Sequence, residues 1–308
     1  MRKLLDARRP RVEPPVDPSP GRGLLRALRP RQWVKNVLVA AAPAAAGVLF
    51  ELANVWPLLA TFATFCAVSS AVYLLNDVAD LTSDRAHPRK RHRPIAAGLV
   101  APSTALAVAG VLAVGGLVGA LLVRPLLGLV VLTYLAVSAG YSLGLKHVPV
   151  IDLLAVASGF VLRAAAGAAA IDIPVSSWFL TVMAFGALAM AAGKRSSELG
   201  RSGAEAGASR PVLEQYTGSF LLQVETVAIG GALVGYALWA FDPSARPGGP
   251  PAWLELSVVP FAAALLRYLW AISQGRAEAP EEAVFADSVL GCAVVVWTGL
   301  FLAGVAQR

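Results

Sequence analysis

The chain has 308 residues, of which 57% are hydrophobic and 15% are charged, and its mean hydropathy is +0.65. This composition is too apolar for an ordinary soluble domain, and the length suffices for about nine membrane helices of roughly 20 residues each. The net charge of +7 could suggest a nucleic-acid-binding protein. In a membrane protein, however, the placement of the basic residues matters more than their sum, and no nucleic-acid partner is expected.

The chain is predicted to be an all-α integral membrane protein. Residues 1–30 are rich in Arg and Pro and contain no apolar run of signal-peptide length, so we expect a disordered cytoplasmic tail. Residues 31–308 are expected to form a single transmembrane catalytic domain. Its predicted membrane runs are about 33–50, 56–78, 102–123, 125–143, 150–170, 174–193, 220–241, 253–272 and 284–306.

The distribution of Lys and Arg predicts the orientation. With nine spans, one side of the membrane receives the N-terminus and the loops near 79–101, 144–149, 194–219 and 273–283, which together hold 21 of the 26 Lys and Arg residues. Cytoplasmic loops carry such an excess. We therefore expect a multi-pass protein of the plasma membrane, with a cytoplasmic N-terminus and an active site that faces the cytoplasm.

The acidic residues at the end of the second run give the strongest functional signal. Asp77, Asp80 and Asp84 occupy positions i, i+3 and i+7, which lie within about 60° of one another on a helix. Three carboxylates this close repel one another unless a cation joins them. Mg²⁺ prefers oxygen ligands from carboxylates, waters and substrate phosphates. We therefore predict that these three residues are catalytic and bind Mg²⁺, with Asn76 beside them as a substrate ligand.

A basic loop follows directly and supplies the complementary charge. Lys90 and Arg93 lie in this loop, together with Arg89 and Arg91. Acidic residues, Mg²⁺ and a basic loop are together what a diphosphate site needs. The competing interpretation is a solvated helix cap followed by a cytoplasmic basic loop, and the shared face of the three Asp residues disfavours it.

Two clusters elsewhere on the cytoplasmic side are further candidates. Lys35 and Asn36 open the first run, where they could bind a phosphate or anchor the chain at the interface. Tyr141 and Lys146 close the fourth run, and Asp152 opens the fifth. A hydroxyl, an ammonium and a carboxylate this close could bind a phosphate and a sugar, or they could be ordinary interface residues.

The end of the sixth run and the middle of the fifth contain the remaining candidates. Lys194 and Arg195 form a basic pair that could hold a phosphate. Lys194 and Glu198, at i and i+4, could also form an ordinary surface pair. Arg163 lies roughly 20 Å along the fifth run at 1.5 Å per residue, and at that depth we expect it to face the protein interior rather than the site.

The pattern Asn76-Asp77-x-x-Asp80-x-x-x-Asp84 on the second of nine membrane helices resembles the UbiA superfamily of intramembrane prenyltransferases, over about residues 25–306. In that family the first Asp motif binds Mg²⁺-diphosphate, and the helices enclose a cavity open to lipid. Typical members carry a second Asp-rich motif at the end of helix six, where this chain has Lys194 and Arg195. That departure indicates one branch, the decaprenyl-phosphate phosphoribosyltransferases, which the chain resembles in RPRQWVKN (29–36), HPRKRHRPIAAG (87–98), YSLGLK (141–146) and AAGKR (191–195).

The resemblance implies transfer of 5-phosphoribose from 5-phosphoribosyl-1-diphosphate to a polyprenyl (decaprenyl) phosphate, with release of diphosphate. The product of this branch supplies cell-wall arabinan. On this interpretation Mg²⁺ on the Asp residues neutralises the departing diphosphate. Basic residues hold the sugar phosphate and the lipid phosphate: Lys35, Lys90, Arg93, Lys146, Lys194 and Arg195.

Two other functions stay open. A UbiA-type prenyltransferase would move a prenyl group from a prenyl diphosphate to an aromatic or other small acceptor, but Lys194 and Arg195 in place of the second Asp motif disfavour it. A transporter of lipid-linked intermediates would need polar residues through the full membrane depth, and only Arg163 approaches that requirement. The sequence leaves open the prenyl chain length and whether the chain forms a homo-oligomer.

Overall fold

Helices make up nearly all of the structure. The computed structural model describes residues 20–202, 211–242, 252–274 and 286–306, and within these ranges the chain forms helices and connecting turns without strands. Eight helices are long and apolar enough to cross a membrane. They are α3 (Leu52–Ala79), α5 (Pro102–Val123), α6 (Pro125–Leu143), α7 (Ile151–Ile171), α8 (Ser177–Ser202), α9 (Gly218–Ala240), α10 (Trp253–Ser273) and α12 (Ser288–Val305). The predicted all-α, multi-pass membrane fold is confirmed.

The shorter elements lie between and before these spans. They are α1 (Pro20–Ala27), η1 (Pro30–Ala40), α2 (Ala41–Ala45), α4 (Leu81–Ala86), η2 (Lys90–His92), η3 (Leu145–His147) and η4 (Pro211–Gln215). Proline defines several boundaries, because a proline at the first helical position lacks only an N–H that would have no intrahelical partner. Pro102 and Pro125 begin α5 and α6 in this way, and the extended residue Arg124 separates the two helices.

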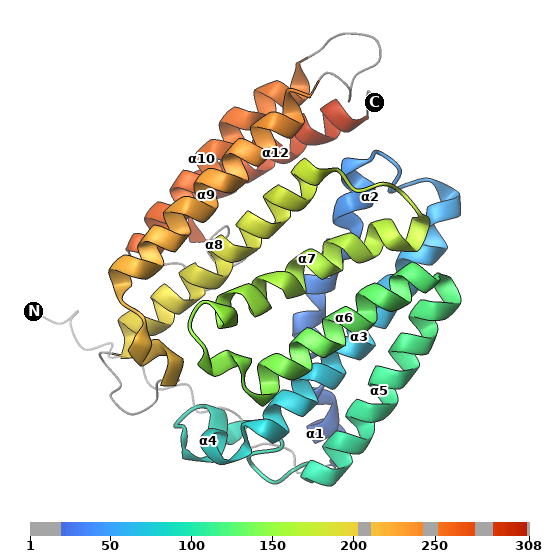
Figure 1. Ribbon diagram of the computed structural model, residues 1–308, viewed down its shortest axis with the longest axis vertical. Coiled ribbons are helices and arrows are strands. Elements are labelled where there is room, and N and C mark those ends of the chain that lie inside the picture. The colour runs from blue at the N-terminus through green and yellow to red at the C-terminus, as the bar shows by residue number, and fades with distance from the viewer. Residues whose placement is uncertain (1–19, 203–210, 243–251, 275–285, 307–308) are drawn as a thin grey trace, which may run out of the picture.

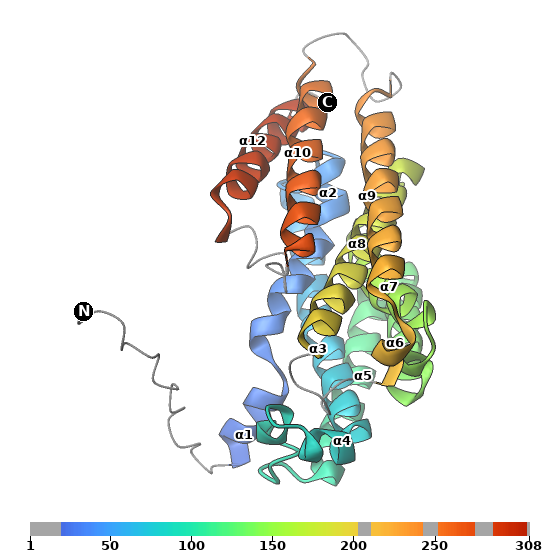
Figure 2. The ribbon, with the colours of Figure 1, turned by 90° about the vertical axis from the view of Figure 1, so that its left-hand side faces the viewer.

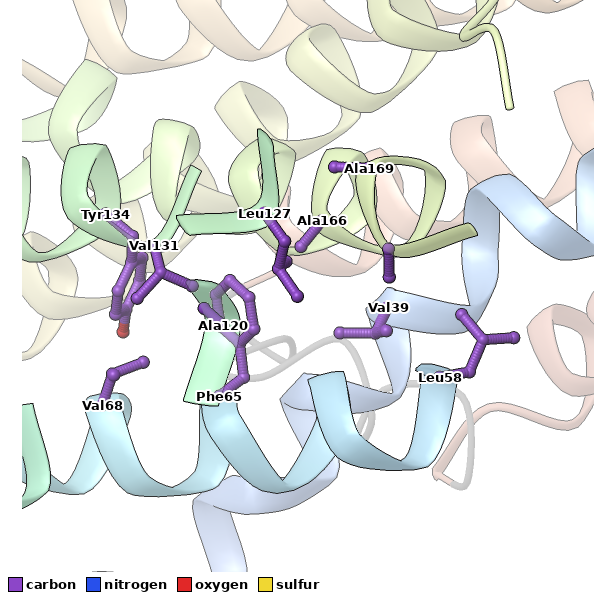
Figure 3. Close-up of a cluster of buried hydrophobic side chains, with 11 residues drawn as sticks. Val39, Leu58, Phe65, Val68, Ala120, Leu127, Val131, Tyr134, Ala166 and Ala169 are labelled. Atoms are coloured by element: carbon purple, nitrogen blue, oxygen red, sulfur yellow. The ribbon is translucent and has the colours of Figure 1, made fainter. Parts of the chain in front are cut away.

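The helices pack mainly against their neighbours in the chain. α3, α5, α6 and α7 form one half of the bundle and α8, α9, α10 and α12 the other, as Figures 1 and 2 show, and α7 packs against α8 where the halves meet. Side chains from α3, α6 and α7 form the core of the first half, where Phe65 and Val68 face Val131 and Tyr134 (Figure 3). Small residues along α7, including Ala166 and Ala169, permit this close approach.

The first predicted membrane run, at about 33–50, forms no long α-helix. It is divided into the 3₁₀ helix η1 and the short helix α2, and it turns at Gly47, whose φ is +77°. This segment packs directly on α7. A Cβ built on Gly167 of α7 would lie 1.8 Å from the carbonyl oxygen of Val39, so the two backbones are in direct contact.

Arg163 binds the same segment from inside the bundle. Its side chain is buried, and its Nε donates to Asn36 Oδ1 at 2.8 Å. Its Nη2 donates to the Tyr134 hydroxyl at 2.9 Å, and its Nη1 donates to the Gly159 carbonyl at 2.7 Å. The prediction that Arg163 faces the interior is confirmed. These bonds join η1 to α6 and α7.

Helix α1 lies within the segment predicted to be a disordered tail. Residues 1–19 of that segment lie outside the described residues, but 20–27 are helical. Ala27 is buried with Ala71 and Leu74 of α3. The prediction of disorder is therefore wrong for residues 20–30, because apolar packing on α3 holds them in place.

Several segments from different helices gather at one end of the bundle. The ends of α3, α6 and α8 and the beginnings of α7 and α9 lie there, next to α4 (Figure 1). The loops 79–101 and 144–149 lie at this end, together with the described part of 194–219. This end holds the predicted site residues.

Candidate active site

The Asp-rich segment does not continue as one helix. α3 ends at Ala79, α4 begins at Leu81, and Asp80 between them has φ −91° and ψ 5°. The three Asp side chains therefore do not share the single helical face expected from their spacing. In the ranges that the structure describes, no three His, Cys, Asp or Glu side chains converge as a metal-binding group. Each Asp is paired with basic side chains instead.

Asp77 is the most enclosed of the three. Its side chain is 2% exposed, and Oδ1 accepts hydrogen bonds from Arg29 Nη2 at 2.5 Å and from Arg93 Nη1 at 3.1 Å. Oδ2 is also buried and has no hydrogen-bond partner. The guanidinium of Arg29 lies 5.0 Å from the centre of the Tyr73 ring, a distance that permits a cation–π interaction.

Asp84 shares a partner with Asp77. Its buried side chain accepts a 2.7 Å hydrogen bond from Arg93 Nη1 at Oδ2. Burial raises the pKa of the Asp84 carboxyl, and the Arg93 guanidinium offsets only part of that effect. The pKa of the nearby His87 is lowered by burial and by the positive charges of Lys90 and Arg89. Arg93 thus joins the two sides of the helix break.

Asp80 faces a different element. Its Oδ2 accepts a hydrogen bond from Asn76 Nδ2 at 3.1 Å, and its Oδ1 accepts one from Lys146 Nζ. Lys146 belongs to η3, in the connection between α6 and α7. The structure therefore places Arg93 of the basic loop against Asp77 and Asp84. It also brings Lys146, which the sequence grouped with Tyr141 and Asp152, to Asp80.

The donor set is compatible with a divalent cation. The free Asp77 Oδ2 is a buried acceptor without a donor, an arrangement that costs free energy until a cation or donor meets it. Asp80 and Asp84 supply further carboxylate oxygens beside their basic partners. Mg²⁺ takes one or two carboxylates with waters and substrate phosphates. Asp77, with Asp80 and Asp84 beside it, could hold such an ion.

A second buried cluster lies around Arg195. The guanidinium is 3% exposed and its Nε donates to Asp152 Oδ2 at 2.7 Å. Its Nη1 donates to Glu198 Oε2 at 3.0 Å and its Nη2 to the Tyr141 hydroxyl at 3.1 Å. Tyr141, Asp152 and Arg195, predicted as separate substrate ligands, thus bind one another. Together they join the ends of α6 and α8 to the beginning of α7.

The remaining predicted ligands lie on other segments. Lys35 is half-buried on η1, Lys90 is half-buried on η2, and Lys194 is exposed near the end of α8. Asn36 points inward to Arg163 and Cys66 instead of toward the site. It helps to hold η1, and its depth in the membrane run was the sequence signal for an inward position.

Sequence reasoning missed three buried contacts. In the sequence Arg29 stands out only as part of RPRQWVKN, yet it binds Asp77. Tyr216 donates a hydrogen bond to Asp152 Oδ1, and it lies in a loop that carries no motif. Glu225 is buried in α9, where Oε1 accepts a 2.5 Å hydrogen bond from Ser196 and Oε2 has no partner. An acidic residue within an apolar run was the available signal for Glu225.

Curated relatives match nearly the whole chain. A decaprenyl-phosphate phosphoribosyltransferase of Mycolicibacterium smegmatis is 44% identical over 293 residues, covering 92% of each chain. The enzyme of that name from Mycobacterium tuberculosis is 44% identical over 288 residues, covering 92% of this chain and 94% of its own. The one from Corynebacterium glutamicum is 44% identical over 282 residues, covering 89% and 84%.

Solved structures share the fold at low identity. A UbiA homolog from Archaeoglobus fulgidus bound to DMAPP and Mg²⁺ gives a TM-score of 0.69 at 16% identity, covering 92% of this chain and 99% of that chain. A digeranylgeranylglyceryl phosphate synthase gives a TM-score of 0.63 at 15% identity, covering 94% and 99%. The sequence profile of the UbiA prenyltransferase family matches residues 37–290. The chain belongs to the UbiA prenyltransferase family.

Proposed function

We propose that this protein transfers 5-phosphoribose from 5-phosphoribosyl-1-diphosphate to decaprenyl phosphate and releases diphosphate. The observation that carries the proposal is the 44% identity to decaprenyl-phosphate phosphoribosyltransferases over about nine-tenths of the chain. The site geometry agrees with it. Carboxylates paired with basic side chains lie at one end of an apolar bundle. A reaction between two phosphorylated substrates needs such positive charge to bind phosphate groups.

The reaction exchanges one oxygen substituent at the anomeric carbon for another. The bond from ribose C1 to the diphosphate oxygen breaks, and diphosphate leaves with the electron pair. A lipid phosphate oxygen forms the new bond to C1. The nucleophile is already an anion, so the site needs to position it and to balance charge more than to remove a proton.

The carboxylates and their basic partners are proposed to have different roles. Asp77, with Asp80 and Asp84, is the proposed site for Mg²⁺. When bound, Mg²⁺ supplies positive charge that stabilises the departing diphosphate. Arg29 and Arg93 neutralise Asp77, and Lys146 neutralises Asp80. These cations lie beside the carboxylates, and they are proposed to contact the phosphate oxygens of the substrates.

The other predicted ligands complete the proposed substrate site. Lys35, Lys90 and Lys194 are proposed to contact the phosphates, and Asn76 to contact the ribose or a phosphate. The buried group of Tyr141, Asp152 and Arg195 is proposed to shape the site through its mutual bonds. The site is proposed to face the cytoplasm, in a plasma-membrane protein whose product serves cell-wall synthesis.

Replacing Lys194 with Ala is expected to raise the KM for one phosphate substrate by about tenfold or more, because a hydrogen bond to a charged group contributes about 1.5–3 kcal/mol. Little change in kcat is expected. Initial rates with each substrate varied in turn will identify the phosphate concerned. Arg124→Ala is the control, since Arg124 pairs with Asp172 between other helices. Unchanged KM values for both substrates would make Lys194 an interfacial anchor.

The experiment that tests the function uses purified protein in detergent with Mg²⁺ and decaprenyl phosphate. Ribose-labelled 5-phosphoribosyl diphosphate is added, and label is counted in the lipid fraction with and without a chelator. Chelator-sensitive label in the lipid supports the proposal. If no label reaches the lipid but a prenyl diphosphate reacts with a small acceptor, the protein is a prenyltransferase of the same family.

A further inference from the structure

Tyr216 connects two parts of the site that are far apart in the sequence. Its hydroxyl donates a hydrogen bond to Asp152 Oδ1 and accepts one from the backbone N–H of Val150 at 2.7 Å. The ring is 6% exposed and directly follows η4, where Val212 and Leu213 are also buried. These neighbours fix the ring, so the hydroxyl has a defined position.

The residue that Tyr216 binds has a strained backbone. Val150 has φ 68° and ψ −46° just before α7, a region that a β-branched residue rarely adopts. Such conformations cost about 1–3 kcal/mol each and persist only when the surroundings hold them. The side chain of Val150 is 43% exposed, so the hydrogen bond from its N–H is a more specific restraint than its packing.

The strained residue lies next to the element that carries Lys146. η3 spans Leu145–His147, and it packs against both α7 and η4. Lys146 reaches from η3 to Asp80 Oδ1 at the break between α3 and α4. A change in the backbone at Val150 therefore moves the segment that delivers this ammonium group to the carboxylates.

We propose that Tyr216 is a positioning residue for phosphoribosyl transfer, whose hydroxyl holds Val150 in the conformation that places Lys146 beside Asp80. The inference rests on the function proposed above. The role requires one group that both donates and accepts, as a tyrosine hydroxyl does. Burial, with a further contribution from the hydrogen bond to Asp152, raises the pKa of Tyr216 to about 12, so the hydroxyl keeps its proton at neutral pH.

The first test compares two Tyr→Phe variants. Tyr216→Phe is expected to lower kcat/KM by about tenfold, since a net hydrogen bond contributes about 1 kcal/mol and the displaced backbone adds to its loss. Tyr236→Phe is the matched control, because that buried hydroxyl bonds to Ser257 at 2.6 Å and Trp297 at 2.9 Å among α9, α10 and α12. Equal activity of Tyr216→Phe and wild type would overturn the inference.

A double-mutant cycle separates positioning from general stability. If Tyr216 acts through Lys146, adding Tyr216→Phe to Lys146→Met should produce little further loss, because coupled residues are non-additive. Effects that multiply would show that Tyr216 supports the fold only, and would overturn the inference. Thermal unfolding of each variant accompanies the rates.

A rescue variant covers the case in which Tyr216→Phe folds poorly. Glycine adopts positive φ without steric cost, so Val150→Gly in the Tyr216→Phe background is expected to recover most of the lost activity. Failure to recover activity in a folded double variant counts against the inference. Wild-type protein that transfers no ribose would refute the proposed function, and the inference with it; active wild type with an equally active Tyr216→Phe would refute the inference alone.

Discussion

Replacing Asp77 with Asn is expected to reduce kcat for ribose transfer by at least about 100-fold, the scale of losing one preorganised electrostatic contact in a transition state. The substitution keeps the side-chain shape but removes the charge that meets Arg29 and Arg93. An Asn side chain also has an uncharged amide in place of the carboxylate, so the position of the unpartnered Oδ2 would hold either an amide nitrogen or a neutral oxygen. Oδ2 is the oxygen proposed to meet a metal ion. Initial rates across a Mg²⁺ titration will measure the loss.

Asp172→Asn is the matched control for Asp77→Asn. Asp172 follows α7 and pairs with Arg124 Nη1 at 2.7 Å, and both side chains are largely exposed. Exposed ion pairs contribute little, typically about 0–1 kcal/mol, so this variant should keep wild-type rates and stability. Near-normal turnover by Asp77→Asn would refute the metal assignment, provided that its unfolding temperature matches that of the wild type.

The spans were predictable because their signal is local. The predicted runs 102–123 and 125–143 coincide with α5 and α6. Each helix begins at a proline, which favours the first helical position, and continues as a long apolar stretch. Hydropathy carries no information on which helical form an apolar run takes. η1 is a 3₁₀ helix, and it contacts Gly167, which lies far along the chain, so only the packed structure shows that contact.

The sequence predicted which residues lie near the site, but not which side chain each of them binds. The spacing places Asp77, Asp80 and Asp84 close together in the sequence. At the helix break, Asp77 and Asp84 share Arg93, whereas Asp80 pairs with Lys146. Arg195 was expected to bind a phosphate because a basic residue at a membrane helix end usually meets solvent or ligand. It is instead enclosed by Asp152 and Tyr141, since α6, α7 and α8 converge on it.

Replacing Gly167 with Ala is expected to destabilise the protein by about 3 kcal/mol or more, at or beyond the upper end for overpacking a core. The added Cβ would lie 1.8 Å from the Val39 carbonyl oxygen and 2.9 Å from its carbon. Both are backbone atoms, so no side-chain rotation can relieve the clash, and η1 must move away from α7. The loss is measured by thermal or denaturant unfolding in detergent.

The same displacement should reduce activity, because η1 begins directly after Arg29, the partner of Asp77, and carries Lys35. Gly115→Ala on α5 is the control, since nothing lies within 4 Å of the added Cβ. Alanine is favoured over glycine in a helix by about 1 kcal/mol, so this control should be neutral or slightly stabilising. If Gly167→Ala were as stable and active as Gly115→Ala, the direct backbone contact between η1 and α7 would be refuted.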